Sequence, residues 1–471
     1  MDFLFISYIM THYELPLPIV ATGDNFKALG KVFTDYLKST GAFLLRRNAQ
    51  RKKDIEANVY HDILRAYVHS VLRGGENPME FFMEGTRTRV GQVLRPKTGL
   101  LSMVVDGMID KVFEDVYILP VAINYQRPIE EQLYIAENTP QIDRRKPKES
   151  AKNLISAFDT IMKRQYGKVY VRFLEPFKLS EYFDEWKTVT KTVSVDNGTR
   201  ENVLFEFTNS LASKVCLSQA NHNVLMPFNL VTCSLLSRTF LQSNYKLKEQ
   251  EKGTLRLPLS ESRLEVLDEF KLDRDNIIRA TPDRKYVEFN SDALTFQTML
   301  YYSNQLIQVL LPVAICSLLL DKLNQWKQYR TIRNLLSREF FANESFMEHE
   351  FKDTLKVLQR SSITEGAKQL VIRHLAYFIR CYLKFLQYLG RHQEAFDKNE
   401  FFHSQEGYGL EDEELYISKD MLKNMISLVK DEGICEQMLT EEHLKVVNME
   451  KLEELIIEYE RVIKVIVEQE V

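Results

Sequence analysis

The feature that most constrains the fold of this chain is a change in its hydrophobic period. Up to about Glu185, short apolar runs alternate with segments of helical period, whereas beyond Arg200 almost every segment has helical period. Alternation of this kind predicts an α/β domain with a mostly parallel sheet. The runs expected as strands are Ile19–Thr22, Ala42–Leu45, Met79–Met83, Val116–Asn124 and Val169–Phe173. Helices are expected between them at Asn58–Leu72, Thr98–Met108 and Lys152–Arg164.

The polar stretch from Trp186 to Arg200 contains an Asn-Gly turn and is the expected domain boundary. We therefore predict an α/β domain over residues 1–190 and a mainly α-helical C-terminal domain over residues 201–471. The helices expected in the second domain are Val203–Val215, Phe228–Ser243, Ala293–Arg333, Phe346–Gln359, Ala367–Gly390, Lys419–Glu432 and Met449–Val467. The last of them has an apolar stripe, which indicates intramolecular core, or alternatively an interface for a protein partner.

Composition excludes several classes of protein. A formal net charge of −4 argues against wholesale binding of nucleic acid, because affinity for a phosphate backbone needs a dominant basic surface. Five cysteines without a Cys-x-x-Cys pair predict reduced thiols, with neither disulfides nor a zinc site. The apolar run Leu306–Leu320 is shorter than a bilayer span and contains Pro312, which indicates a core helix or a helix that contacts a membrane surface.

An anion site is predicted where the run Met79–Met83 ends. Glu84, Gly85, Thr86, Arg87 and Arg89 follow it directly. Glycine lets a backbone approach a ligand, threonine offers a hydroxyl, and arginine forks match the oxygens of a phosphate. A plain turn with solvated arginines would have the same short sequence.

A second pair of arginines, Arg46 and Arg47, follows the run Ala42–Leu45. Sites in α/β domains gather at the carboxyl ends of parallel strands, so both pairs are expected at one edge of the sheet.

Three segments resemble the conserved blocks of the glycerol-phosphate and glycerone-phosphate acyltransferases. Gly41–Arg47 (Gly-Ala-Phe-Leu-Leu-Arg-Arg) resembles the second block, and Phe82–Arg89 (Phe-Met-Glu-Gly-Thr-Arg-Thr-Arg) resembles the third. Arg95–Leu101 is similar to the Pro-Lys-x-Gly-Leu-Leu that trails the third block. Leu119–Tyr125 resembles the fourth block and contains Pro120. The segments occur in the family's order and cover the first domain well, while the helical half resembles the family only loosely.

The family's first block is a catalytic His-x-x-x-x-Asp, and here the sequence departs from the pattern. Asp2 matches the aspartate, which places the histidine before Met1, so the α/β domain is expected to be N-terminally incomplete. One explanation is a shortened form of a longer enzyme. The other is a protein that has lost catalysis and serves as an acyltransferase-like binding or regulatory protein. A start within an apolar, helix-like run favours the first explanation.

The resemblance implies an O-acyltransferase that uses acyl-CoA as co-substrate and needs no metal and no organic cofactor. It implies that Asp2 belongs to the catalytic pair and that Arg46, Arg47, Arg87 and Arg89 bind the phosphate of the acceptor. The residues it implies to shape this site are Gly41, Phe43, Glu84, Gly85, Thr86 and Pro120.

The resemblance favours glycerone phosphate (dihydroxyacetone phosphate) as the acceptor, because Met79–Phe82 and Glu130–Tyr134 are more similar to that group. Glycerol 3-phosphate stays open. The implied roles are ether-lipid and phospholipid synthesis at an intracellular membrane, that of the peroxisome or alternatively the mitochondrial outer membrane or the endoplasmic reticulum. The last residues, Val467–Val471, do not match a Ser-Lys-Leu peroxisomal signal.

Overall fold

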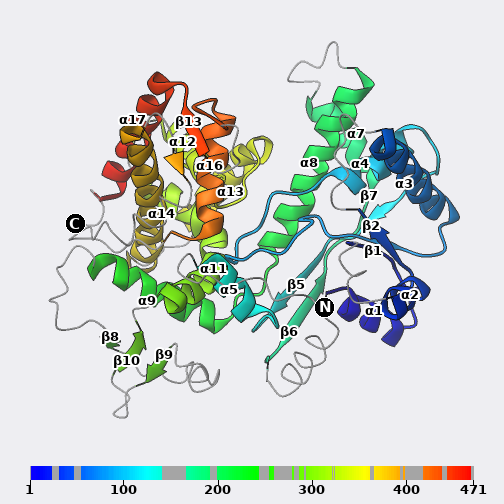
Figure 1. Ribbon diagram of the computed structural model, residues 1–471, viewed down its shortest axis with the longest axis horizontal. Coiled ribbons are helices and arrows are strands. Elements are labelled where there is room, and N and C mark those ends of the chain that lie inside the picture. The colour runs from blue at the N-terminus through cyan, green and yellow to red at the C-terminus, as the bar shows by residue number, and fades with distance from the viewer. Residues whose placement is uncertain are drawn as a thin grey trace. The chain divides into compact units, whose positions relative to one another are not determined.

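The computed structural model describes residues 2–23, 31–46, 55–139, 166–190, 199–242, 254–258, 278–280, 286–290, 293–320, 322, 324–360, 365–392, 396–397, 417–437 and 443–467. These residues form two compact units (Figure 1). Unit 1 comprises residues 1–87, 95–129 and 145–224, and unit 2 comprises residues 88–94, 130–144 and 225–471. The predicted helix Lys152–Arg164 lies outside the described residues.

A small parallel sheet lies at the centre of the first part of unit 1. Its strands are β1 (Ile19–Gly23), β2 (Ala42–Leu45) and β3 (Met79–Glu80), in the order β2-β1-β3. Val20 pairs with Ala42 on one side and with Glu80 on the other, both in parallel register. The carboxyl ends of all three strands therefore meet at one edge, as the sequence predicted for this part of the domain.

The remaining strands of unit 1 pair differently from the prediction. The run Val116–Asn124 forms two strands, β4 (Tyr117–Ile118) and β5 (Val121–Tyr125), which Pro120 separates. β4 pairs with β7 (Phe177–Lys178) and β5 with β6 (Val169–Phe173), both antiparallel. Proline has no N–H to donate to a strand ladder, which explains the break. The expectation of a mostly parallel sheet is thus correct only for the three strands β1, β2 and β3.

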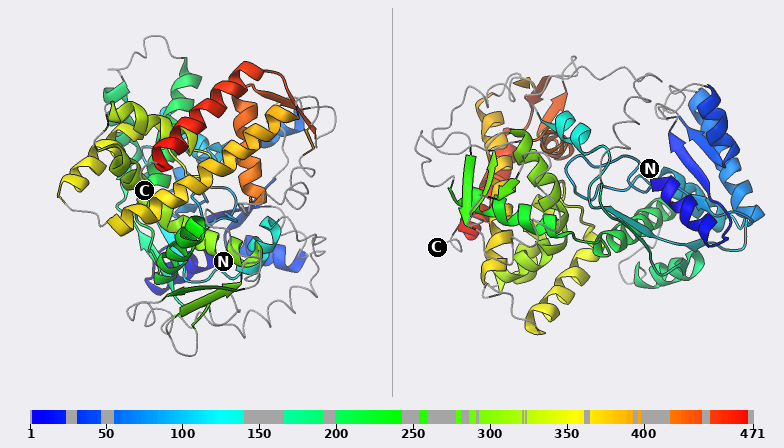
Figure 2. Two further views of the ribbon diagram at one scale, coloured as in Figure 1. Left: turned by 90° about the vertical axis from the view of Figure 1, so that its left-hand side faces the viewer. Right: turned by 90° about the horizontal axis from the view of Figure 1, so that it is seen from below.

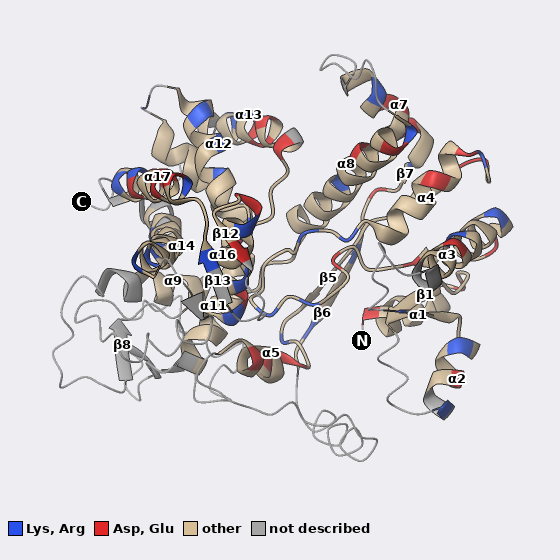
Figure 3. Cartoon of the chain, turned by 45° about the horizontal axis from the view of Figure 1, so that its top comes forward, with Lys and Arg blue, Asp and Glu red and all other residues tan. Residues whose placement is uncertain are grey.

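Helices cover the rest of unit 1. They are α1 (Asp2–His12), α2 (Lys31–Ser39), α3 (Ile55–Gly74), α4 (Gly99–Ile109), α7 (Leu179–Thr190) and α8 (Arg200–Asn221). α4 is the central one, since it packs against α3, α7 and α8 and is almost wholly uncharged (Figure 3). Its one carboxylate, Asp106, is buried and paired with Arg65 (3.2 Å) and Arg200 (2.7 Å).

Unit 2 is mainly helical in the part of the chain that the structure describes, as the period of its sequence predicted. They are α5 (Glu131–Asn138), α9 (Pro227–Gln242), α11 (Ala293–Leu319), α12 (Gln325–Leu335), α13 (Glu344–Arg360), α14 (Glu365–Arg391), α16 (Lys419–Asp431) and α17 (Met449–Val467). The predicted single helix Ala293–Arg333 is two helices, because Asn324 takes a left-handed conformation (φ 56°) before α12. The short strands are β8 (Thr254–Pro258), β9 (Ile278–Ala280), β10 (Tyr286–Asn290), β11 (Phe396–Asp397), β12 (Cys435–Gln437) and β13 (His443–Val446).

Two apolar segments of unit 2 belong to its core. α17 lies along α14 (Figure 2), and its stripe residues Leu452, Tyr459 and Ile466 are fully buried there, which confirms the prediction of intramolecular core. The segment Leu294–Leu319 is long and apolar enough to cross a membrane, but 78% of its most apolar window is buried. All five cysteines are buried and free, as predicted.

Candidate active site

The second-block arginine, Arg46, follows β2 directly at the carboxyl edge of the parallel sheet. Its backbone N–H donates a hydrogen bond to the Tyr60 hydroxyl (3.0 Å), and its guanidinium lies 5.3 Å from the centre of the Tyr60 ring. The side chain is exposed, so the cation–π contact orients the guanidinium while its donors still face solvent. Arg47 lies outside the described residues.

The third block forms a tight turn just beyond β3, at the same edge. The Gly85 N–H donates to the Phe82 carbonyl (3.1 Å), and Gly85 has a φ of +62°. A Cβ atom at Gly85 would lie 2.8 Å from Cγ of Lys97, so both the backbone and the space favour glycine here. Thr86 and Arg87 are exposed beyond the turn. The sheet therefore brings Arg46 and the start of the turn that contains Arg87 to one edge, while the convergence of all four arginines stays a prediction.

Arg89, the other predicted arginine of this block, lies in unit 2. Its Nε donates to Oε2 of Glu137 on α5 (2.7 Å), and both side chains are about one-third exposed. An arginine can contact more than one anion, so the ion pair leaves its predicted role as a phosphate ligand untested.

The glycines and the proline predicted to shape the site have defined structural roles. Gly41 has a φ of +94° and precedes β2, and its carbonyl accepts from the Val20 N–H (3.2 Å). Phe43 on β2 packs against Tyr67 of α3, with ring centroids 5.1 Å apart. The Pro120 carbonyl accepts a hydrogen bond from the Leu174 N–H (3.0 Å). This bond connects the break between β4 and β5 to the residue that follows β6.

The Glu84 carboxylate lies close enough to α8 to affect the pKa of the Cys216 thiol. Burial, and secondarily the charge of the nearby Glu84 carboxylate, raises the pKa of the Cys216 thiol to about 12. Cys216 is therefore a protonated, inert thiol at neutral pH.

Asp2 contacts the fourth block and lies near strand β3. The Tyr125 hydroxyl, at the end of the fourth-block strand β5, donates a hydrogen bond to the Asp2 carboxylate, and the rings of Phe5 and Tyr125 lie 6.0 Å apart. Glu80 of β3, just before the third block, is close enough for the charge of Asp2 to affect its titration. Asp2 thus lies beside β5, which carries most of the fourth block, and near β3, which precedes the third block.

Glu80 is a functional candidate that the sequence analysis missed. Both of its carboxylate oxygens are buried without a hydrogen-bond partner among the described residues. Burial, and secondarily the charge of Asp2, raises the pKa of Glu80 to about 7. Strongly shifted pKa values of this kind cluster at functional sites. The signal in the sequence was a carboxylate within the otherwise apolar run Met79–Met83.

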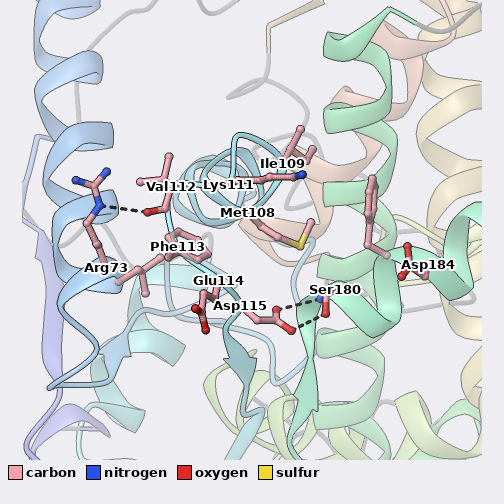
Figure 4. A pocket seen from close by; sticks show the side chains of 12 residues that line it. Arg73, Met108, Ile109, Lys111, Val112, Phe113, Glu114, Asp115, Ser180 and Asp184 are labelled. Atoms are coloured by element: carbon pink, nitrogen blue, oxygen red, sulfur yellow. Dashed lines mark hydrogen bonds between the residues drawn. The ribbon is translucent and has the colours of Figure 1, made fainter.

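A pocket of about 930 Å³ in unit 1 is a different place from the predicted site (Figure 4). It lies at the far end of α4 from the third block, and none of the predicted site residues lines it. Its wall is stabilised by internal hydrogen bonds, from Arg73 Nε to the Val112 carbonyl (3.1 Å) and from the Ser180 N–H to Asp115 (3.2 Å). Because these side chains already bind one another, the convergence at Asp2 is the better candidate for chemistry.

Comparison with known proteins finds two matching families. The family described as "Acyltransferase" matches residues 1–124, and the family described as "Glycerol-3-phosphate acyltransferase C-terminal region" matches residues 144–404.

The relatives include proteins named dihydroxyacetone phosphate acyltransferase and proteins named glycerol-3-phosphate acyltransferase. The chain is 28% identical over 443 residues to dihydroxyacetone phosphate acyltransferase of Oryctolagus cuniculus, covering 83% of this chain and 63% of that protein. It is 28% identical over 397 residues to the enzyme of that name from Homo sapiens, covering 76% and 56%. It is 32% identical over 243 residues to glycerol-3-phosphate acyltransferase of Hamiltonella defensa, covering 50% and 28%. The chain thus spans less than two-thirds of the length of these relatives.

Proposed function

Because this chain belongs to the glycerol-3-phosphate acyltransferase family, we propose that it transfers an acyl group from acyl-CoA to the hydroxyl of a small phosphorylated acceptor. The observation that carries the proposal is the edge of the β2-β1-β3 sheet, where Arg46 follows β2 and the turn that contains Arg87 follows β3, the two strands on either side of β1. Asp2 contacts the fourth-block strand through Tyr125.

In the proposed reaction the acceptor hydroxyl oxygen attacks the thioester carbonyl carbon. A C–O bond forms, the C–S bond breaks, and the hydroxyl proton ends on the coenzyme A thiol. The products are an ester and free coenzyme A. In the family's motif a histidine takes up the proton and an aspartate fixes its tautomer, and Asp2 occupies the aspartate's position. The matching histidine position precedes Met1.

Arg46 and Arg87 bind the acceptor phosphate in this proposal, with Arg47 and Arg89 as further ligands. Guanidinium groups bind phosphate oxygens through paired hydrogen bonds, so they fix the acceptor's orientation as well as its affinity. A fixed acceptor presents its hydroxyl to the thioester, which lowers the entropic part of the barrier.

We propose glycerone phosphate as the first candidate acceptor, which would place the protein in ether-lipid synthesis. Support comes from the relatives named dihydroxyacetone phosphate acyltransferase, which align with up to 83% of this chain. The relatives named for glycerol 3-phosphate align with about half of it, so glycerol 3-phosphate is the second candidate. The ratio of kcat/KM for the two acceptors decides between them.

We also propose that the protein works at a membrane surface, because its acylated product partitions into a bilayer. α1 and the segment after it expose Leu4, Tyr8, Tyr13 and Leu15, each at least 47% accessible. Amphipathic aromatic side chains of this kind favour the bilayer interface. We propose the peroxisomal membrane first, and co-sedimentation with lipid vesicles tests the membrane contact.

Acyl transfer in a version of the protein extended upstream, with a histidine five residues before Asp2, tests the reaction. Acyl-CoA and glycerone phosphate should yield ester and free coenzyme A, and Arg87→Ala should lower kcat/KM for the acceptor at least about tenfold, as expected for losing a charge-assisted bond. Arg391→Ala, which changes an exposed arginine at the end of α14 in unit 2, is the matched control. Activity that Arg87→Ala leaves unchanged would defeat the assignment.

A further inference from the structure

We propose that Lys214 is a site of covalent acylation, at which its side-chain amine takes an acyl group from acyl-CoA. The evidence lies within unit 1, where the ammonium group of Lys214 lies on two aromatic rings and has no carboxylate within ion-pair distance among the described residues. The acyl donor is that of the proposed function, on which the inference rests to this extent only. The step needs neither the phosphorylated acceptor nor the catalytic pair.

Lys214 lies on the face of α8 that packs against α7. Phe207 precedes it by seven residues and Ser210 by four, so the three side chains share one side of the helix. The fully buried Phe207 ring lies 4.8 Å from the Phe183 ring of α7, and Oγ of Ser210 lies 3.0 Å from the Tyr182 hydroxyl (Figure 1). The helical period therefore places a lysine on a stripe that packs against aromatic side chains.

Two aromatic rings lie against the ammonium group. Nζ of Lys214 is 3.8 Å from the centre of the Tyr182 ring and 4.7 Å from the centre of the Phe177 ring on β7. The two rings meet edge to face, with centroids 5.8 Å apart, and Tyr182 is only 8% exposed. Ring faces attract a cation but offer no strong hydrogen-bond acceptor, so they replace only part of the hydration that the ammonium group loses.

The charges on α7 do not restore what burial removes. Burial lowers the pKa of Lys214, and the exposed Glu185 carboxylate opposes this shift only secondarily. Burial also raises the pKa of Tyr182, so its phenol is neutral at neutral pH. A larger fraction of Lys214 is therefore the neutral amine than in an ordinary lysine.

The other elements that pack near Lys214 bring no unpaired carboxylate among the described residues. α4 carries one carboxylate, Asp106, which is paired with Arg200, and Arg200 lies roughly 20 Å along α8 from Lys214. β5 carries only the phenol of Tyr125, and β7 carries a second cation, Lys178. Nothing on these elements favours the charged form of Lys214.

Two other lysines of this region have the carboxylate partner that Lys214 lacks. Nζ of Lys178 lies 3.5 Å from Oε1 of Glu181, and Nζ of Lys187 lies 2.6 Å from Oδ1 of Asp184. Both of these lysine side chains are more than 40% exposed, whereas Lys214 is half-buried. Exposure alone therefore predicts that Lys178 and Lys187 react first, and the loss of hydration predicts that Lys214 does.

The proposed step is an aminolysis of the thioester. The neutral Nζ of Lys214 attacks the thioester carbonyl carbon, a C–N amide bond forms and the C–S bond breaks. One N–H proton passes to the sulfur, so the products are an uncharged amide and free coenzyme A. Lysine amines in apolar surroundings are activated for such attack because only the neutral form has a free electron pair.

Peptide mass spectrometry of the whole chain after incubation with acetyl-CoA tests the proposal. At neutral pH, Lys214 should be acetylated at least about threefold faster than Lys178 or Lys187, and Lys214→Arg should lose this adduct alone. The rate at Lys214 should also reach its plateau at a lower pH than the rate at Lys178, whose pKa is raised by Tyr117 and then by Glu181. A merely structural lysine would show neither result.

Two exposed carboxylates of α7 provide matched variants. Glu185→Gln removes the charge that opposes the shift at Lys214, so it should quicken acetylation of Lys214 and leave Lys178 unchanged. Glu181→Gln removes the partner of Lys178, so it should quicken acetylation of Lys178 and leave Lys214 unchanged. Both changes are on the surface and leave the aromatic contacts of Lys214 in place.

All of these results are required. Acetylation of Lys214 no faster than that of Lys178, coincident pH profiles at the two lysines, or a rate at Lys214 that Glu185→Gln does not change would each overturn the proposal. Its failure is distinguishable from failure of the proposed function, because the incubation contains no acceptor. Acetylation of Lys214 without acyl transfer to glycerone phosphate in the histidine-containing protein would leave the inference standing and defeat the proposed function, and the reverse pair of results would do the opposite.

Discussion

The Tyr125 hydroxyl donates a hydrogen bond to the Asp2 carboxylate, joining residues 123 positions apart in the chain. The bond links the position of the family's catalytic aspartate to the last residue of β5. An aspartate that orients a histidine must itself be held in place, so under the proposed function the Tyr125 hydroxyl is a positioning group for Asp2.

Removing this hydroxyl should slow acyl transfer. In the histidine-containing protein, Tyr125→Phe should lower kcat by about tenfold or less while changing KM little, because the hydrogen bond orients a catalytic group and does not bind substrate. Tyr170→Phe on the paired strand β6 is the control, since Tyr170 pairs with Asn124 through its backbone. A kcat equally reduced in both variants would assign the effect to the sheet and not to Asp2.

Glu80 should make stability depend on pH. Its pKa is raised from 4.5 to about 7 by burial and by Asp2, so between these values the folded protein binds more protons than the unfolded chain. The free energy of unfolding therefore falls as pH rises through this interval and is constant above it. Glu80→Gln should abolish this fall and stabilise the protein at pH 8 by about 1–3 kcal/mol.

Chemical denaturation of the Glu80 variant at pH 5 and pH 8 measures the effect. Glu76→Gln, which changes an exposed carboxylate nearby, should retain the pH dependence of the unmodified protein. An identical pH dependence in Glu80→Gln and the unmodified protein would show that Glu80 titrates normally.

Gly85→Ala should destabilise unit 1 for two separable reasons. A positive φ costs about 1 kcal/mol in a non-glycine residue, and the contact with Lys97 adds strain. Gly75→Ala isolates the first cost, because Gly75 has a φ of +67° but no atom within 4 Å of a Cβ. Gly74→Ala has neither problem and should be neutral. Equal denaturation midpoints for Gly85→Ala and Gly74→Ala would contradict the geometry of this turn.

The buried ion pair of unit 2 should matter far more than an exposed one. Arg333 is 1% exposed and holds Glu350 through two hydrogen bonds, from Nε (2.9 Å) and Nη2 (3.1 Å). Arg333→Met should destabilise by about 3–5 kcal/mol, because it leaves Glu350 and the Tyr329 hydroxyl without their cation. Arg330→Met breaks the exposed pair with Glu344 and should cost at most about 1 kcal/mol. Similar losses in the two variants would contradict the role of burial.

Helices in which the apolar residues recur with helical period over many turns could be predicted from the sequence. α9, α13, α14, α16 and α17 lie within a few residues of their predicted bounds, because each buries one apolar face whatever its neighbours are. The three parallel strands were likewise predicted from short apolar runs. Two predicted elements are each divided in the structure, the strand Val116–Asn124 at Pro120 and the helix Ala293–Arg333 near Asn324. The short helices α2 and α5 were missed, since so few turns carry little periodic signal.

Residues of the candidate site could be predicted from the sequence only where they belong to one contiguous motif. Arg46, Gly85 and Arg87 could be named from motifs, because each motif is contiguous. The shifted pKa of Glu80 depends partly on Asp2, and Tyr125 meets Asp2 across 123 residues. Nothing local in the sequence indicates such pairs, so only the folded structure identifies them.

The most direct test of the central claim is a double-mutant cycle on acceptor binding. Calorimetry would give Kd for glycerone phosphate in the unmodified chain, Arg46→Ala, Arg87→Ala and the double variant. The account predicts that each single change weakens binding at least about tenfold and that the double variant loses less than the sum, since both guanidinium groups bind one phosphate. An unchanged Kd in both single variants would contradict it.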